Sequence, residues 1–416
     1  MKIFTPADIL LPNVDSMEKW AVIACDQFSS QPEYWKETRE YVKDAPSTLH
    51  MILPEAELGD GDEEEKIKKI HQNMNAYSEQ GLFKEYKDSF IYIERTLQNG
   101  NVRKGLIGMV DLEAYSYEEG ASSLVRATEK TVLERIPPRM RIREGAELEF
   151  PHVQILCDDV EKMLIEPIGN MKSELTKLYE FDLMKEGGHI AGWLVQGDVK
   201  DAFELRLHAY ERSLEDKYTD VNGIPMTFAV GDGNHSLATA KACYEKLKKE
   251  SPKKNYSNHP ARYALVELEN IHSSALEFEP IHRILTGVDP EDILKKLAAE
   301  CGTEDVENAH RVEWCSGEES GTIYLEKKSP LAVGVLQPFL DSYLNAMGGE
   351  IDYIHGDEVL KTLAKKEQSI GFILPAMEKS QLFIGVMEDG VLPRKTFSMG
   401  HACDKRYYLE GRRLDR

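Results

Sequence analysis

The residues best suited to chemistry lie in one glycine-rich turn. The sequence GDGNHS at residues 231–236 separates an apolar segment, residues 225–230, from a stretch with helical periodicity, residues 237–249. Glycine permits positive φ angles and lets a ligand approach the backbone closely. A helix that begins after such a turn presents N–H groups without carbonyl partners, which attract phosphate or carboxylate. The pattern predicts an anion site formed by Gly231, Gly233, Asn234 and Ser236.

Two side chains of this turn can take part in a reaction. Asp232 can hold a metal ion or accept a proton, and His235 can donate to a phosphoryl oxygen or relay a proton. The alternative is that Asp232 and Asn234 only cap the helix, while His235 makes an ordinary hydrogen bond. Capping explains an Asp or Asn but needs neither the flanking glycines nor the histidine, so a functional role is favoured.

Familiar motifs for other chemistries are absent from the 416 residues. There is no G-x-x-x-x-G-K-[ST] phosphate loop, no G-x-S-x-G nucleophile elbow and no H-E-x-x-H zinc motif. Ser236 stands where a dinucleotide fingerprint has its third glycine. The six cysteines form no C-x-x-C pair, which argues against a zinc site and against a disulfide framework.

Further candidate groups lie outside the turn. Asp26 follows a short apolar run and precedes a helix, which makes it the candidate base; an ordinary loop carboxylate is the alternative. Arg126 and Glu129 would share a face if their stretch is helical, and a surface ion pair is the simpler interpretation. His282 and Arg283 lie at a predicted strand end, where loops often carry function.

Composition narrows the class of protein. Hydrophobic residues make up 41% and charged residues 30%, which is typical of a globular chain. The net charge of −22 repels a phosphate backbone, so we expect no nucleic-acid partner, and an anionic ligand needs a locally positive pocket. The apolar runs are too short to span a bilayer, and the N-terminus lacks a secretory signal. We therefore expect a cytoplasmic protein with no membrane partner.

Sequence periodicity predicts a chain of mixed helices and strands. Helices are expected at residues 31–42, 201–218, 237–249, 291–300 and 357–366. Strands are expected at residues 90–97, 102–112, 153–157, 225–230, 262–268, 321–325, 370–374 and 382–386. This indicates an α/β or α+β fold with mixed sheets. A main domain, residues 1–285, would carry the turn, and residues 286–416 would form a second lobe.

Several motifs, in this order, resemble those of DUF1015, a family of uncharacterised prokaryotic proteins. The family's His-Glu-x-Thr stretch is similar to residues 127–131, and its Asp-Gly-His-His-Arg turn to residues 232–236. Its Pro-Thr-His-Arg stretch is similar to residues 279–283, and its late Met-Pro-x-Lys-Ser-Thr stretch to residues 392–396. The resemblance covers about residues 15 to 400.

The turn also resembles that of the ParB/sulfiredoxin-like fold, which includes free-serine kinases. This resemblance implies a core of that fold around residues 225–250. It also implies that the turn binds nucleotide phosphate and that a separate acidic residue deprotonates the serine hydroxyl. Here Asn234 replaces a histidine and Ser236 replaces an arginine, which removes a bidentate phosphate donor. Arg126, Arg283 or Lys395 would then have to supply the positive charge.

The function predicted on this basis is that of a small-molecule phosphotransferase, resembling a kinase of free serine or of a similar hydroxylated metabolite. It would use Mg²⁺, held by Asp232, and a nucleotide or another phosphate donor, with Asp26 as the base. A first alternative is a non-catalytic regulatory protein that binds an anion or a nucleotide. A second is a ParB-like protein associated with nucleic acid, which the net charge disfavours.

Overall fold

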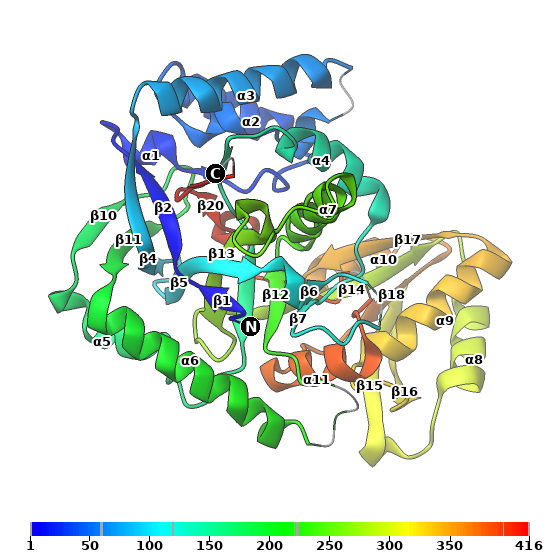
Figure 1. Ribbon diagram of the computed structural model, residues 1–416. Helices are drawn as coiled ribbons and strands as arrows, with labels where there is room; N and C mark the ends of the chain where they lie inside the picture. Colours follow the sequence, from blue (N-terminus) through cyan, green and yellow to red (C-terminus); the bar gives the residue numbers. More distant parts are fainter. Residues whose placement is uncertain are drawn as a thin grey trace.

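Two β-sheets organise the chain (Figure 1). The computed structural model describes residues 2–58, 61–118, 120–219, 221, 224–393 and 395–414. The larger sheet has the strand order β10-β11-β4-β5-β13-β9-β12-β7-β6, with β1 paired to β5 and β2 paired to β4. The smaller sheet has the order β16-β15-β18-β14-β17, with β19 paired to β14. Both parallel and antiparallel pairs occur, so the predicted α/β or α+β class with mixed sheets is confirmed.

The larger sheet and its helices occupy most of the first 270 residues. Its strands are β1 (Phe4–Thr5), β2 (Ala7–Pro12), β4 (Phe83–Thr96), β5 (Val102–Asp111), β6 (Tyr115–Ser116), β7 (Val125–Ala127), β9 (Gln154–Cys157), β10 (Lys177–Asp182), β11 (His189–Val195), β12 (Phe228–Asp232) and β13 (Tyr263–Asn270). Its helices are α1 (Met17–Trp20), α2 (Pro32–Val42), α3 (Glu63–Glu79), α4 (Ile136–Arg143), α5 (Glu166–Asn170), α6 (Gly197–Lys217) and α7 (Asn234–Glu250).

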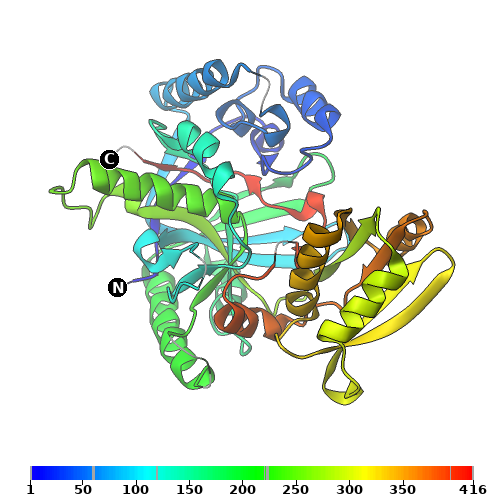
Figure 2. The same ribbon diagram turned by 90° about the vertical axis from the view of Figure 1, so that its right-hand side faces the viewer.

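The smaller sheet and its helices follow. Its strands are β14 (Phe278–Thr286), β15 (Ala309–Ser316), β16 (Glu319–Glu326), β17 (Glu350–His355), β18 (Ser369–Ile373) and β19 (Phe397–Met399). Its helices are α8 (Pro290–Cys301), α9 (Ala332–Met347), α10 (Asp357–Ala364) and α11 (Lys379–Asp389). Figure 2 shows this part lying against one side of the larger one.

The larger sheet is buried on both faces, as the alternation along β4 shows. Phe90 and Tyr92 pack into the core that also contains α6, whereas Ile91 and Ile93 pack into the core that contains residues of α2 and α3. Successive side chains of a strand point to opposite faces, so a strand between two cores must be apolar at nearly every position.

Most predicted elements are confirmed, but one strand assignment is wrong. Residues 382–386 belong to helix α11 and not to a strand. Leu382, Phe383 and Val386 are buried at a spacing of three and four residues, which is the helical repeat, and a short apolar run does not distinguish the two structures. Arg126 lies on β7, so it shares no helix face with Glu129.

The chain crosses between the two parts more than once. The predicted division at residues 285/286 falls inside β14, which pairs with strands of the smaller sheet. After β19, the chain returns to the larger part, where β20 (Tyr407–Tyr408) pairs with β3 (Val22–Ile23) and β21 (Arg412–Arg413) pairs with β8 (Leu148–Glu149). The two-domain description with that boundary stays a prediction.

Within the described residues, no helix has both the length and the apolar character needed to cross a membrane. The remaining helical turns are short 3₁₀ segments: η1 (Thr48–Met51), η2 (Glu55–Glu57), η3 (Leu112–Ala114), η4 (Leu133–Arg135), η5 (Lys172–Glu174), η6 (Pro260–Arg262), η7 (Val306–Asn308) and η8 (Ala402–Asp404).

A group of charged side chains is buried at the centre of the larger sheet. Glu267 and Glu269 on β13 are fully buried, and the Arg103 guanidinium of β5 lies 3.3 Å from a Glu269 carboxylate oxygen. Arg406, from the returning C-terminal segment, forms an ion pair with Glu267. One oxygen of each glutamate has no hydrogen-bond partner among the described residues, and a proton held between the two carboxyl groups would satisfy both.

Burial raises the pKa of Glu269 to about 8, an effect that Arg103 opposes and the charge of Glu267 reinforces. The folded protein therefore keeps a proton on Glu269 that the unfolded chain releases near its ordinary value of 4.5. The stability that depends on this proton is fully present below about pH 4.5 and is lost as the pH rises towards 8.

We predict that Glu269→Gln stabilises the folded protein at pH 8.5 by on the order of 2 kcal/mol, because glutamine imitates the protonated acid. Urea unfolding at several pH values measures the effect. The wild type should lose stability between pH 5 and pH 8.5 more steeply than the variant does. Glu64→Gln, at an exposed position of α3, is the matched control and should leave the profile unchanged. The same dependence of the unfolding free energy on pH in the wild type and in Glu269→Gln would contradict the prediction.

Candidate functional site

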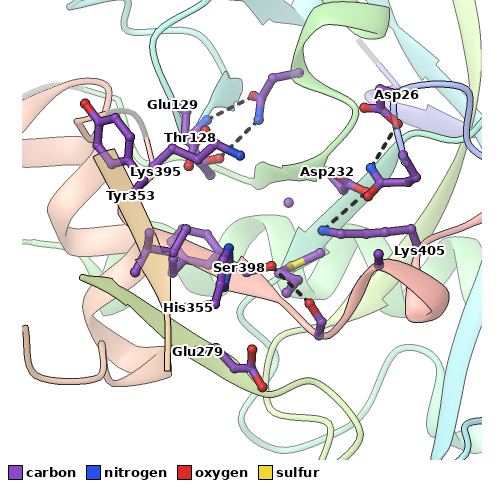
Figure 3. Close-up of a pocket in the computed structure, with 18 of the residues that line it drawn as sticks. Asp26, Thr128, Glu129, Asp232, Glu279, Tyr353, His355, Lys395, Ser398 and Lys405 are labelled. Atoms are coloured by element: carbon purple, nitrogen blue, oxygen red, sulfur yellow. Dashed lines mark hydrogen bonds and ion pairs between the residues drawn. The ribbon is translucent and has the colours of Figure 1, made fainter. Parts of the chain in front are cut away.

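A pocket of about 1020 Å³ lies where the two sheets approach each other, and both contribute to its lining. The larger part supplies Asp26, Glu129 and the turn at residues 231–235, while the smaller part supplies residues from β14 and β17. The segment 395–405 closes a further side. Figure 3 shows Asp26, Asp232, Lys395 and Lys405 arranged around a common space.

The glycine turn has the predicted strand–turn–helix form. Gly233 has φ +79°, and a Cβ atom there would lie 3.0 Å from the Cα atom of Val153. A Cβ atom on Gly231 would lie 2.9 Å from side-chain atoms of Leu156 and Met399. Position 233 therefore requires glycine, whereas a side chain at Gly231 would have to displace its side-chain neighbours. The turn places the first N–H groups of α7, which have no partner within the helix, at the edge of the pocket.

The capping alternative for Asp232 and Asn234 is wrong. The N-cap residue of α7 is Gly233, and no side chain caps this helix. The Asn234 side chain instead reaches back to the end of β7, where its oxygen accepts the N–H of Thr128 at 3.3 Å. Asn234 thus fixes the turn against the neighbouring strand, which leaves the backbone as the part of the turn that faces a ligand.

Two carboxylates lie beside the turn. The Asp232 carboxylate is 3.7 Å from the Lys405 ammonium, and its Oδ2 atom is buried without a hydrogen-bond partner among the described residues. Burial raises the pKa of Glu129, Lys395 and Lys405 oppose that shift, and the charge of Asp232 adds to it. Glu129 and Asp232 are therefore near enough to influence one another; Glu129 is near both lysines, and Asp232 is near Lys405.

Two of the three lysines that line the pocket, Lys395 and Lys405, extend inward from opposite sides in Figure 3. Lys395 has φ +58°, a left-handed conformation that is costly for a residue with a Cβ atom. Its carbonyl oxygen accepts a hydrogen bond of 2.8 Å from the Arg283 guanidinium, which holds it in place. Such strain is typical of functional positions.

Three residues predicted to bind phosphate lie away from this pocket. The Arg126 guanidinium donates to the carbonyl oxygens of Ser123 and Ile224. Arg283 is fully buried and donates to Gln337 at 2.8 Å as well as to Lys395. Carbonyl and amide oxygens therefore occupy both guanidinium groups. Of the three predicted cations, Arg126, Arg283 and Lys395, only Lys395 lines the pocket.

Ser236 is the third residue that was predicted to bind phosphate and that lies away from the main pocket. Its hydroxyl group lies 3.0 Å from the Nε2 atom of His152, and it lines a second cavity behind the turn. Arg394 belongs to the stretch at residues 392–396 that resembles the family's late motif, and it is outside the described residues.

His235 lines the pocket as a neutral donor. Its Nε2 atom accepts the N–H of Val132 at 3.2 Å, so its ring proton must be on Nδ1. Burial lowers the pKa of His235 to about 4, and the positive charges of Arg139 and Arg135 contribute. With its lone pair engaged, His235 is suited to donate a hydrogen bond, which is one of the two roles expected from the sequence.

Asp26 lines the same pocket, 3.9 Å from the Nε2 atom of His152. Although burial raises the pKa of Asp26, the charge of His152, a hydrogen bond from Gln27 and the charge of Lys405 together hold it below its ordinary value. A lowered pKa makes a carboxylate a weaker base.

His282 contributes to the pocket edge mainly as a structural group. Its Nδ1 atom accepts the N–H of Leu374 at 3.2 Å, and its Nε2 atom lies 2.8 Å from the Asp357 carboxylate. Burial lowers the pKa of His282, an effect that Asp357 partly offsets. The ring thereby connects β14 to the start of α10.

Sequence reasoning missed several groups of the pocket: Thr128, Glu279, Tyr353, His355 and Lys405. Lys405 is the most consequential, since it is the cation nearest to Asp232. It belongs to no recognisable motif, and only the return of the chain after β19 brings it to the turn. Thr128, by contrast, lies in a stretch that the family resemblance had singled out.

No cluster of three or more histidine, cysteine or acidic side chains suited to a metal ion is found in the part of the chain that the structure describes. Magnesium, however, commonly takes only one or two carboxylates, completing its shell with water and substrate phosphate. The Oδ2 atom of Asp232 accepts no hydrogen bond from the described residues and lies 3.7 Å from the Lys405 ammonium; with Glu129 nearby, it fits that donor set.

A family model matches residues 8–375, and its description is "Protein of unknown function (DUF1015)". The chain belongs to the DUF1015 family. The match covers most of the sequence and includes the glycine turn. No curated protein matches the chain.

Solved structures with some similarity are distant. A mutant free serine kinase in complex with ADP has 10% identity and a TM-score of 0.39, over 77% of this chain and 95% of that chain. A conserved hypothetical protein from Pyrococcus furiosus has 11% identity and a TM-score of 0.33, over 73% and 93%. SbnI with a C-terminal truncation, from Staphylococcus aureus, has 12% identity and a TM-score of 0.36, over 71% and 82%. At this level of similarity their ligands carry no argument for this chain, and the ParB/sulfiredoxin-like core stays a prediction.

We predict that His235 stays neutral, with its proton on Nδ1, from pH 8 down to about pH 5. The reason is the pKa of about 4 together with the hydrogen bond from Val132 to Nε2. Nitrogen NMR of ring-labelled protein measures the protonation of each ring nitrogen, and loss of the signals in His235→Gln assigns them. A ring that titrates near pH 6.5, or one with its proton on Nε2, would contradict the prediction.

Proposed function

We propose that this protein is a phosphotransferase that moves a phosphoryl group from a nucleotide to a hydroxyl group of a small metabolite. The observation that carries the proposal is the arrangement of one pocket. The glycine turn and the start of α7 face Lys395 and Lys405 there, and Glu129 and Asp232 lie beside them. Phosphoryl transfer needs this combination of positive charge for the phosphate and a carboxylate near the acceptor hydroxyl.

The phosphate chain would lie on the backbone of the turn. The first N–H groups of α7 and the helix dipole favour negative charge at that position. Lys395 and Lys405 would neutralise further charge, replacing the arginine that the family's usual turn carries at the position of Ser236. In a chain with a net charge of −22, these two lysines would place positive charge where the anionic ligand lies.

Glu129 is the better candidate for the base that activates the hydroxyl group. Its pKa is raised by burial, whereas the pKa of Asp26 is held low by His152, Gln27 and Lys405. A general base is most effective when its pKa approaches the working pH. We therefore assign the base to Glu129 and not to Asp26, the candidate from the sequence.

Asp232 would hold Mg²⁺ together with the phosphate oxygens, and the ion would supply positive charge to the phosphoryl group. Asp232 would serve this role through Oδ2, which accepts no hydrogen bond in the described part of the protein and lies 3.7 Å from the Lys405 ammonium.

The alternative is a regulatory protein that binds a nucleotide or another anion without turnover. The loss of the turn arginine and the occupied Arg126 and Arg283 side chains favour this alternative. A ParB-like protein associated with nucleic acid is a second alternative, which the acidic surface opposes.

One screen separates the three possibilities. Melting temperature is measured with ATP, ADP, pyrophosphate and serine, each with and without Mg²⁺, and with duplex DNA at physiological salt. Stabilisation by a nucleotide with formation of a phosphorylated metabolite supports the phosphotransferase. Stabilisation without product supports the regulatory alternative. Stabilisation by DNA alone would overturn both.

We predict that Lys405→Met weakens nucleotide binding by about tenfold or more, because it removes one of the two ammonium groups that face the turn. Titration calorimetry with the nucleotide found in the screen measures the change. Lys253→Met, at an exposed position after α7, is the matched control and should bind like the wild type. Equal affinity for Lys405→Met and wild type would remove Lys405 from the phosphate site.

We predict that Glu129→Gln lowers kcat by about a hundredfold or more and changes nucleotide affinity less than about threefold. A lost base slows the chemical step, while an amide of the same shape retains the packing. Asp26→Asn is the comparison and should lower kcat much less. If Asp26→Asn stopped turnover while Glu129→Gln stayed active, the base would be Asp26.

A further inference from the structure

A second cavity, of about 160 Å³, lies behind the glycine turn and shares Glu55 with the main pocket. Most of its lining is apolar and includes Met51, Leu53, Met74, Leu148, Phe150 and Leu237. Its size is comparable with the roughly 150 Å³ apolar cavity that admits benzene in an engineered protein. Ser236, His152 and Tyr408 also line it, so this apolar space has a polar wall.

Three side chains of that wall form a continuous hydrogen-bonded row. The Ser236 hydroxyl group lies 3.0 Å from the Nε2 atom of His152. The Nδ1 atom of the same ring lies 2.9 Å from the Tyr408 hydroxyl group, which also accepts the N–H of Cys25 at 3.1 Å. His152 is only 5% exposed, so its orientation is set by these partners. The row has the order of a nucleophile, a base and a group that orients the base.

The position of Ser236 in the fold suits a nucleophile. It lies in the first turn of α7, directly after β12 and the glycine turn. The positive end of a helix stabilises negative charge that develops on a reacting oxygen. The chain has no G-x-S-x-G motif, but catalytic serines are recognised by geometry and not by one sequence pattern.

We infer that Ser236 and His152 form a nucleophile–base pair that takes an acyl group from an ester whose short aliphatic or aromatic acyl chain occupies the apolar cavity. This activity is separate from the proposed phosphoryl transfer and does not rest on it. Its residues differ from those assigned to the nucleotide: it uses neither Lys395 nor Lys405, and Glu129 has no part in it.

The reaction balances within the groups named. The Ser236 oxygen attacks the ester carbonyl carbon, and the hydroxyl proton passes to the Nε2 atom of His152. The bond from the carbonyl carbon to the alcohol oxygen breaks, and the alcohol leaves with that proton. Water then attacks the acyl-serine ester through the same base, the carboxylic acid leaves, and the proton returns to Ser236.

A fluorophosphonate probe tests the pair directly, since the serine oxygen displaces fluoride from phosphorus only when a base activates it. Intact mass and peptide mapping of the full chain should find one adduct, on Ser236. Ser236→Ala should lose it, and His152→Gln should form it about a hundredfold more slowly. Ser213→Ala is the control, because Ser213 is also a helix serine with a hydrogen-bonded hydroxyl group but is exposed, and it should leave labelling unchanged.

A second variant keeps the test decisive if His152→Gln unfolds or if the probe does not fit. In Ser236→Cys, His152 should make the new thiol react with iodoacetamide at least about tenfold faster than in Ser236→Cys with His152→Gln. Hydrolysis of p-nitrophenyl butyrate by the wild type, lost in Ser236→Ala at unchanged melting temperature, supports the inference. A folded wild type that neither carries an adduct on Ser236 nor hydrolyses the ester overturns it. Equal rates of alkylation for Ser236→Cys with and without His152→Gln would overturn it as well. None of these outcomes tests the proposed phosphoryl transfer.

Discussion

The buried guanidinium group of Arg406 holds the functional part of this molecule together. It forms ion pairs with Glu267 in the centre of the larger sheet and with Glu410, and it donates to the carbonyl oxygen of Pro151 at 3.2 Å. A buried charge without partners is very costly, so the chain can adopt this arrangement only with the C-terminal segment in place. The neighbouring residues follow from it: Lys405 reaches the main pocket, and Tyr408 reaches the smaller cavity.

A second arginine secures the same segment by a different chemistry. Arg95 is buried on β4 and donates to the carbonyl oxygens of Cys403, Asp404 and Lys405. It thereby fixes the backbone of that segment, whereas Arg406 fixes it by charge. Burial lowers the pKa of Arg95 to about 10, and this cost is compatible with folding because several carbonyl oxygens share the positive charge. The position of the Lys405 ammonium group is thus set by the core of the protein and not by the pocket itself.

The sequence predicted the local parts of this structure better than their assembly. The strand–turn–helix around Gly233 was predictable, because the required positive φ angle and the following helical periodicity are both local properties. The strands β4 and β5, expected at residues 90–97 and 102–112, were predictable for the same reason, and Asn99-Gly100 between them favours the hairpin that they form. Residues 382–386 were not, because a short apolar run fits a strand and a helix equally.

The site was less predictable than the turn, since its charges come from segments far apart in the sequence. Glu129, Asp232 and Lys405 meet only after β7, β12 and the returning C-terminal segment have been brought side by side. Arg126 and Arg283 were reasonable candidates as cations, but burial gave their guanidinium groups structural partners instead. The type of a side chain indicates what it can bind, whereas its burial decides whether it is available to do so.

His152 links the two cavities, and this has consequences for any chemistry at either one. Its Nε2 atom lies 3.0 Å from the Ser236 hydroxyl group and 3.9 Å from the Asp26 carboxylate, which lines the other pocket. Its ring thus stands between a carboxylate of the larger pocket and a hydroxyl group of the smaller cavity. A substitution of His152 would therefore change the surroundings of both Asp26 and Ser236.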